Sequence, residues 1–369
     1  MRSKQDDNSR PPIMITNKIQ ITENEASAEI SNTNKNETQV TRSSIFEKGQ
    51  YLNPKYEHLD KYVKIMFKSF WTPAKYEKLI KEQDAPYYFN NMNEVDQEAI
   101  KRCILAVALV EDKVKVYWPS LTNDLPQTII GDIGGVFGMS ETVHRRSYHS
   151  LLEALNIDPK EIHQYPQTQG RINYLTKHLE EDPKIIGKKR ILKKLVLFTS
   201  LVERVSLFTQ FYILMSFAKA NKGLKTLSAL QQSTAIEELI HYSCGIDIIN
   251  IIKGEFPHIW DEYLIELVEK NIKAAYIAER QLIDWFFEKG VPDHLTKEEV
   301  VNVLDFNMNQ VCADLKLGIS FEYDEALYNE KNIWMMEKIS NAGEPDFFDT
   351  PAGGYSSEDV EIDIDNFDF

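Results

Sequence analysis

The sequence predicts an all-α fold made of long helices. Apolar residues recur at spacings of three and four from about residue 57 to residue 340, the pattern of helices with one buried face. Asn-Gly hairpin turns, a series of alternating strands and a repeat of fixed period are all missing from the sequence. The motif Glu-x-x-His occurs twice inside these apolar segments. The pattern therefore indicates one helical domain with acidic and histidine side chains in its interior.

The expected helical segments follow one another with short connections. Thr72-Pro73 is typical of a helix start, with proline at the first helical position. Gly223 and Gly254 stand where two long helices are expected to end. The predicted segments are 57–70, 74–83, 94–117, 127–156, 170–180, 184–221, 225–253, 257–289, 296–318 and 324–340.

The two ends of the chain differ in composition from this domain. Residues 1–45 are rich in Asn, Ser, Thr, Glu and Lys and have no apolar periodicity, so we expect them to be disordered. Residues 341–369 contain no Lys or Arg and end in regularly placed Phe and Ile. An acidic segment with apolar anchors is typical of a flexible tail that binds a partner. The predicted helical domain is therefore residues 46–340.

Composition also bounds the partners and the compartment. The chain has 369 residues and a net charge of −15, which argues against nucleic-acid and membrane partners. Cys103, Cys244 and Cys312 are widely separated, as expected for reduced thiols in the cytoplasm. The N-terminus lacks the apolar core of a signal peptide. Residues 195–218 are apolar enough to resemble a membrane span, but Glu203 and Arg204 at their centre favour a buried helix of a bundle.

A first group of polar residues forms one stripe on a predicted helix. Glu141, His144 and Tyr148 stand at relative positions 0, 3 and 7, which return to the same helical face. Glu238 and His241 repeat the Glu-x-x-His spacing in another apolar helix. One such motif is expected by chance, whereas two on separate buried helices indicate a pair of metal-binding positions.

Two further helices each offer one interior carboxylate. Glu203 lies inside the most apolar segment, and Glu111 lies at the end of the run CILAVALV, where the neighbouring Asp112 is an alternative. A third Glu-x-x-His, Glu255 to His258, follows a glycine and contains a proline, so we assign it to a helix junction and not to the site.

Four carboxylates and two imidazoles from four helices define a dinuclear carboxylate metal site in the core of a ferritin-like helical bundle. Oxygen ligands with one imidazole per ion suit iron or manganese. Four buried carboxylates without cations would repel one another, so the cluster itself argues for two ions per chain. Taken singly, a buried histidine is more often a hydrogen-bonded core residue, and Tyr148 a packed aromatic.

The order of these residues resembles the class I ribonucleotide reductase small subunit, the radical-generating β chain. The resemblance covers about residues 55–340 and extends into the C-terminal tail. It implies a stable radical on Tyr148, formed when the dinuclear centre reacts with an oxygen species. The implied ligands are terminal Glu111, His144, Glu203 and His241, and bridging Glu141 and Glu238.

The resemblance also implies a route for the radical and a set of partners. The segment FWTPAKYEKLIKEQ resembles the N-terminal signature of that family, in which Trp71 begins the radical-transfer route. Glu237 stands where that family has an Asp that links this tryptophan to the ligand histidine. Tyr355 is placed like the mobile tyrosine of the tail, and the terminal DNFDF resembles the peptide that docks on the large (alpha) subunit. A homodimer is implied, and a flavoprotein activase if the metal is manganese.

Several positions depart from the commonest pattern of that family. Glu111 replaces an Asp, and Leu207 and Thr234 stand where a pocket around the radical often has Phe and Ile, while Phe211 agrees. A hydroxyl near Tyr148 would hydrogen-bond to it and shorten the life of a radical. These departures leave two alternatives open, a radical on Tyr148 or an oxidising equivalent that stays on the metals. The presence of Tyr148 argues against those members that have Phe there and use a mixed manganese–iron centre.

The sequence thus predicts the β subunit of ribonucleoside-diphosphate reductase, active in deoxyribonucleotide biosynthesis with the large subunit. Two alternatives use the same bundle. A di-metal oxidase or hydroxylase would need neither Trp71 nor Tyr355 nor an acidic tail. A metal-storage bundle is usually shorter and assembles into a shell.

Overall fold

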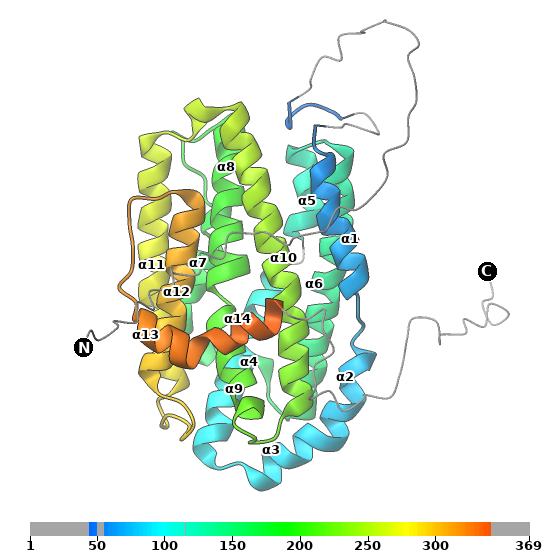
Figure 1. Ribbon diagram of the computed structural model, residues 1–369, viewed down its shortest axis with the longest axis vertical. Helices are drawn as coiled ribbons and strands as arrows, with labels where there is room; N and C mark the ends of the chain where they lie inside the picture. The colour runs from blue at the N-terminus through cyan, green and yellow to red at the C-terminus, as the bar shows by residue number, and fades with distance from the viewer. Residues whose placement is uncertain (1–43, 50–54, 115, 341–369) are drawn as a thin grey trace, which may run out of the picture. The chain divides into compact units, whose positions relative to one another are not determined.

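The computed structural model describes residues 44–49, 55–114 and 116–340, and this part of the chain is helical without strands (Figure 1). The predicted tails, with Tyr355, lie outside the described residues apart from Ser44 and Ile45. Ile45 is buried, and its backbone N–H donates to Glu255 Oε2. The α-helices are α1 (Asp60–Ser69), α2 (Ala74–Leu79), α3 (Ala85–Asn91), α4 (Glu94–Val114), α5 (Tyr117–Asp124), α6 (Thr128–Ala154), α7 (Thr168–Leu175), α8 (Gly187–Leu197), α9 (Phe208–Lys219), α10 (Lys225–Glu255), α11 (Glu262–Phe286), α12 (Lys297–Leu315), α13 (Glu325–Leu327) and α14 (Ile333–Ser340).

Four helices enclose the interior that matters for function. α4 packs against α6 and α9, and α10 packs against α9 and α6, so that the four lie side by side (Figure 1). α11 packs on α4, α7, α8 and α12 and extends the bundle beyond this group. The predicted all-α fold is confirmed. Of the residues selected from the sequence as metal ligands, Glu111, Glu141, His144, Glu238 and His241 lie on α4, α6 and α10, and Glu203 lies in the segment just before α9. In the described part of the chain, no helix combines the length and the apolar character needed to cross a membrane.

The predicted helix 184–221 is divided in the structure. Between α8 and α9 the residues Phe198–Val205 form a π-helical segment, and the backbone N–H of Ser206 donates to the carbonyl of Leu201, five residues earlier. All eight residues of this segment are buried, including Glu203. A π-helical turn holds an extra residue, so it changes the direction in which the following side chains point. Such segments occur frequently at functional sites.

The predicted helix 94–117 ends at Val114, and α5 is a separate helix that the sequence did not reveal. α5 lies very close to α6. A Cβ atom on Gly134 would come within 2.7 Å of the carbonyl oxygen of Trp118, and one on Gly138 within 2.4 Å of the ring of Pro119. Glycines at these two positions of α6, four residues apart on one face, therefore allow the contact that brings Trp118 into the interior.

α10 begins where the sequence predicted a break. Gly223 has φ +72°, a backbone conformation that favours glycine, and the helix starts at Lys225. The carboxylate of Asp84, which precedes α3, accepts a hydrogen bond from the N–H of Leu227 at 2.6 Å. This buried acid satisfies one of the free N–H groups in the first turn of α10, and burial raises its pKa to about 6. α10 runs through Glu255, so the discarded Glu255-x-x-His258 motif does lie at a helix junction.

Candidate metal centre

Six side chains meet in the interior between α4, α6, the π-helical segment and α10. They form two overlapping sets of four, and within each set the ligand atoms lie within 4.8 Å of one another. Each of the six side chains belongs to a residue that is at most 1% exposed. The sets are Glu111, Glu141, His144 and Glu238, and Glu141, Glu203, Glu238 and His241. Two carboxylates shared between two such sets are the arrangement of a dinuclear centre.

Both histidines turn the same ring nitrogen toward the cluster. His144 Nδ1 lies 2.9 Å from Glu238 Oε1, and His241 Nδ1 lies 3.1 Å from Glu141 Oε1 and 3.3 Å from Glu238 Oε2. Glu238 therefore reaches both imidazoles. The more distant contacts, His144 to Glu111 Oε2 at 3.9 Å and His241 to Glu203 Oε2 at 3.7 Å, complete the two sets.

The opposite nitrogen of each histidine is held by a different neighbour. His144 Nε2 lies 2.6 Å from Glu237 Oε2, and His241 Nε2 lies 3.1 Å from Ser140 Oγ. A partner on Nε2 fixes the orientation of an imidazole and leaves Nδ1 free for a metal ion. Glu237 was predicted to link His144 to Trp71, and the structure shows the histidine half of that link.

Many of the inward-facing polar atoms have no hydrogen-bond partner among the described residues. These atoms are both carboxylate oxygens of Glu111 and Glu141, Oε1 of Glu238, and Nδ1 of His144 and His241. Buried polar groups are nearly always paired, and a group of unpaired lone pairs pointing at one point is a site for a cation. The donor set of four carboxylates and two imidazoles fits two divalent ions of the iron or manganese type.

The pKa shifts of the cluster show that, without metal, protons provide the positive charge that metal ions would otherwise supply. Burial raises the pKa of Glu111 and of Glu203 well above the usual range. For His144, burial works against the charged form, but the hydrogen bond with Glu237 and the nearby negative charge of Glu238 outweigh it and raise the pKa. Without metal the cluster therefore balances its carboxylates by holding protons. Two cations would supply that positive charge and release the protons.

Trp118 is a partner of the cluster that the sequence reasoning missed. Its indole Nε1 donates to Glu203 Oε1 at 2.7 Å, across two elements that are far apart in the chain. Ser140 was missed as well, although it directly precedes Glu141. No spacing rule connects Trp118 with Glu203, because the contact depends on the close approach of α5 to α6.

Tyr148 lies two turns beyond Glu141 on α6 and is 1% exposed. Its hydroxyl donates to Oε1 of Gln231 on α10 at 2.7 Å. Burial raises the pKa of Tyr148 well above the usual range, so the ring is a neutral phenol. Gln231 was not selected from the sequence, although it precedes Glu238 by seven residues and so shares its helical face. Leu207, Phe211 and Thr234, which the sequence placed in the surrounding pocket, are all buried.

Trp71 lies beside the cluster, just before α2. Its ring is 5.9 Å from the ring of His144, at an interplanar angle of 25°, and 5.3 Å from Tyr76 in an edge-on contact. Among the described residues, the indole nitrogen of Trp71 has no hydrogen-bond partner. Trp71 is therefore connected to His144 by ring stacking and not through Glu237.

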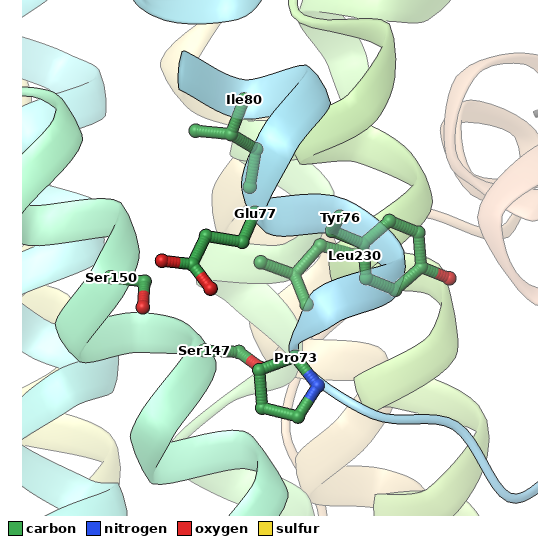
Figure 2. A pocket seen from close by; sticks show the side chains of 7 residues that line it. All are labelled: Pro73, Tyr76, Glu77, Ile80, Ser147, Ser150 and Leu230. Carbon is green, nitrogen blue, oxygen red and sulfur yellow. The ribbon is translucent and has the colours of Figure 1, made fainter. Parts of the chain in front are cut away.

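A small cavity opens where α2 packs on α6 and α10, next to Tyr148 along the chain (Figure 2). Its volume of about 10 Å³ is enough for one water molecule. Ser147 and Leu230, which line it, directly precede Tyr148 and Gln231. The remaining lining residues are Pro73, Tyr76, Glu77, Ile80 and Ser150.

The fold and the paired ligand sets define a ferritin-like helical bundle with a core able to hold two metal ions. Residues 49–340 match the model of the family "Ribonucleotide reductase, small chain", and the chain belongs to this family. The family predicted from the sequence is therefore confirmed. The fold prediction is confirmed with it.

The comparisons with individual proteins agree. The chain is 23% identical over 234 residues to a ribonucleoside-diphosphate reductase subunit beta of Chlamydia pneumoniae. The matched region covers 59% of this chain and 64% of that protein. The structure resembles the ribonucleotide reductase R2 subunit from Clostridium botulinum, with a TM-score of 0.65, 17% identity, and coverage of 82% of this chain and 99% of that one. It also resembles the dimanganese(II)-NrdF of Streptococcus sanguinis, with a TM-score of 0.60, 14% identity, and coverage of 77% and 95%. At these identities the solved structures support the fold alone.

Proposed function

We propose that this chain is the β subunit of a ribonucleoside-diphosphate reductase, which generates and stores the radical that its large subunit uses to reduce ribonucleotides. The observation that carries this proposal is the position of Tyr148. A buried neutral phenol on α6 stands in one stripe with two members of the paired ligand sets.

In this proposal the ligand roles follow from membership of the two sets. Glu141 and Glu238 belong to both and would bridge the ions, while Glu111, His144, Glu203 and His241 would be terminal. The ions would be iron or manganese, and when bound they supply the one-electron oxidising power that side chains lack. Both metals suit this donor set, and the Streptococcus relative is described with two manganese ions.

The protein's own groups then have defined tasks. Glu237 and Ser140 orient the two imidazoles, and Trp118 holds Glu203. The stacked Trp71 offers the first aromatic step from His144 toward the surface. Tyr355 and the acidic tail would carry the radical to the large subunit and dock on it.

The surroundings of the protein complete the proposal. The chain would act as a homodimer in the cytoplasm, where its three buried free cysteines remain reduced. With manganese as the metal, a flavoprotein activase would supply the oxidant. A di-metal oxidase or hydroxylase is the rival reading. The small cavity lined by Ser147 and Leu230 has room for one water molecule and is too small for an organic substrate.

The test combines metal analysis, electron paramagnetic resonance and turnover with the large subunit. The wild-type protein reconstituted with iron(II) or manganese(II) should bind about two ions per chain, the number that the ligand sets predict. It should show a phenoxyl signal and support deoxyribonucleotide formation. Tyr148→Phe should keep the ions and lose the signal and the turnover. A Tyr148→Phe protein with full turnover would contradict the proposal, and turnover without the large subunit would favour the rival oxidase.

A further inference from the structure

The hydroxyl of Tyr148 is held by an amide in a place where an apolar side chain would be easier to bury. Gln231 is 0% exposed and accepts the hydrogen bond of Tyr148 through Oε1 at 2.7 Å. Its Nε2 is also buried and has no hydrogen-bond partner in the described part of the chain. A buried donor left without a partner costs about 1–3 kcal/mol. Such an orphaned group calls for a reason beyond packing.

The surroundings of the phenol show what the amide faces. Gln231 precedes Glu238 by seven residues, so it points from α10 into the same interior as the ligands. Leu207 and Phe211 are apolar and buried. Thr234 and Gln231 are the two buried polar side chains that lower the pKa of Tyr148 against the effect of burial. The hydroxyl of Thr234 makes no hydrogen bond among the described residues, whereas Gln231 bonds to the phenol. Gln231 is thus the residue that holds the hydroxyl of Tyr148 by a hydrogen bond in the described part of the chain.

We propose that Gln231 is the positioning residue of Tyr148 in both of its oxidation states, as acceptor to the phenol and as donor to the phenoxyl radical. This inference rests on the proposed function. The phenol has a hydrogen to give, and Oε1 receives it. The phenoxyl oxygen has no hydrogen and only accepts, so it needs a donor instead.

The geometry of a glutamine amide allows this exchange without moving a neighbour. Half a turn about the bond between Cγ and Cδ exchanges the amide oxygen and nitrogen, which have nearly the same size and position. Nε2 then occupies the place of Oε1, 2.7 Å from the tyrosine oxygen. The donor that is unpartnered beside the phenol acquires its partner when the radical forms. The hydrogen bond thus stabilises the radical form and fixes the ring plane in both states.

The oxidation itself is balanced as follows. The O–H bond of Tyr148 breaks. Its electron would go to the iron or manganese pair, which would supply the oxidising power when bound, and its proton would go to a carboxylate of the surrounding ligand cluster. Among the charged groups that act on the phenol, Glu111 has the largest effect. Gln231 accepts neither the electron nor the proton, because a neutral amide is not a base at neutral pH. Its part is to change from acceptor to donor.

The first experiment uses the full-length protein reconstituted with iron(II) and dioxygen, with glutamine labelled with 15N at the side-chain amide. Pulsed electron–nuclear double resonance on the Tyr148 radical should show a coupling to the 15N nucleus. In deuterated water it should also show an exchangeable deuteron in the hydrogen bond. The wild-type measurement requires no substitution, so it does not depend on the folding of a variant.

The second experiment compares Gln231→Leu with Thr234→Val, which removes the other polar group. In Gln231→Leu the 15N and deuteron couplings should disappear, and the gx component of the high-field spectrum should rise to the value of a phenoxyl without a hydrogen bond. In Thr234→Val both couplings should remain. Gln231→Met, also apolar and similar in length, should repeat the result of Gln231→Leu.

Each contrary outcome has a separate meaning. If the radical forms and keeps its couplings and gx in Gln231→Leu, the inference is wrong while the proposed function stands. If the couplings are lost in Thr234→Val instead, Thr234 is the donor and the inference is wrong. If the wild-type protein binds its metals but forms no radical on Tyr148, the radical step of the proposed function fails and this inference fails with it.

Discussion

Two of the buried groups of charged side chains in the described part of the chain differ in how their hydrogen bonds are completed. In the first, Arg171 on α7 bonds to Glu279 on α11 through two nitrogens and to the carbonyl of Ala106 through a third. Tyr174 donates to the same glutamate at 2.6 Å. Among the described residues, none of the polar side-chain atoms of Arg171, Glu279 and Tyr174 lacks a partner. This group is a closed ion pair.

The ligand cluster is buried just as deeply, but many of its polar atoms have no hydrogen-bond partner among the described residues. Acceptors exceed donors, and unpaired oxygens and nitrogens converge on two points. Burial alone therefore does not distinguish a structural ion pair from a metal site, because both contain fully buried acids. The balance of donors and acceptors does. A surplus of lone pairs requires cations from outside the chain.

The sharpest way to separate the two groups is to remove Glu238, which reaches both histidines. We expect Glu238→Ala to lose nearly all bound metal, because each ion loses a shared ligand. The helical circular-dichroism signal should largely survive, since the bundle is held by its apolar core. The measurement is metal content by mass spectrometry beside the far-ultraviolet spectrum. Complete unfolding of the variant would show that the cluster is structural.

The ion pair should respond in the opposite manner. Glu279→Leu leaves the guanidinium of Arg171 buried without a counter-charge, and we expect the free energy of unfolding to fall by about 3–5 kcal/mol. Metal content under native conditions should stay at that of the wild type. Denaturant unfolding of the metal-free protein measures the loss. The double variant Arg171→Leu with Glu279→Leu should recover most of it, and a double variant as unstable as the single one would contradict the pairing.

Asp84 is a buried acid of a further kind, because among the described residues it has backbone donors but no counter-ion. Burial raises its pKa to about 6, above the ordinary 3.8. The folded state then holds a proton that the unfolded state loses. The contribution of Asp84 to stability is therefore greatest below pH 3.8, declines as the pH rises to about 6, and is constant above that. The total decline from this one group is about 3 kcal/mol, most of it between pH 4 and 7.

Asp84→Asn keeps an acceptor for the N–H of Leu227 and removes the titration. We expect the difference in unfolding free energy between variant and wild type to grow in favour of the variant from pH 4 to pH 7. A constant difference across this pH range would mean that Asp84 is ionised at no unusual cost.

The sequence predicted the residues whose positions follow from helical spacing. Glu141 and His144, and Glu238 and His241, are three residues apart, and both pairs reach the cluster. Glu203 was found because a charge inside a strongly apolar run requires an explanation. These arguments work because each depends on one helix alone.

What remained hidden depends on contacts between helices. Trp118 reaches Glu203 only because Gly134 and Gly138 let α5 approach α6. The sequence shows that these glycines are present, but not which element packs against them. The π-helical segment was also missed. Every residue of it lies in a long, mostly apolar run, so one extra residue does not visibly change the spacing of apolar residues. Gln231 alone had a usable signal, the seven-residue interval to Glu238.

The smallest effect concerns the two groups that orient the imidazoles, and it tests whether the cluster holds two distinguishable ions. Glu237→Gln weakens the partner of His144, and Ser140→Ala removes the partner of His241. Loss of such a partner typically lowers metal affinity about 10–100-fold. The larger loss is expected for Glu237→Gln, because a charged acceptor makes the stronger hydrogen bond.

Because each substitution affects one histidine, a competition titration with a metal-binding dye should show one of the two dissociation constants raised in each variant. The weakened ion should be the one bound by His144 in Glu237→Gln and the one bound by His241 in Ser140→Ala, and the two should differ in their spectra. If both constants rise together in both variants, the shared Glu141 and Glu238 couple the two ions so strongly that they bind as one unit.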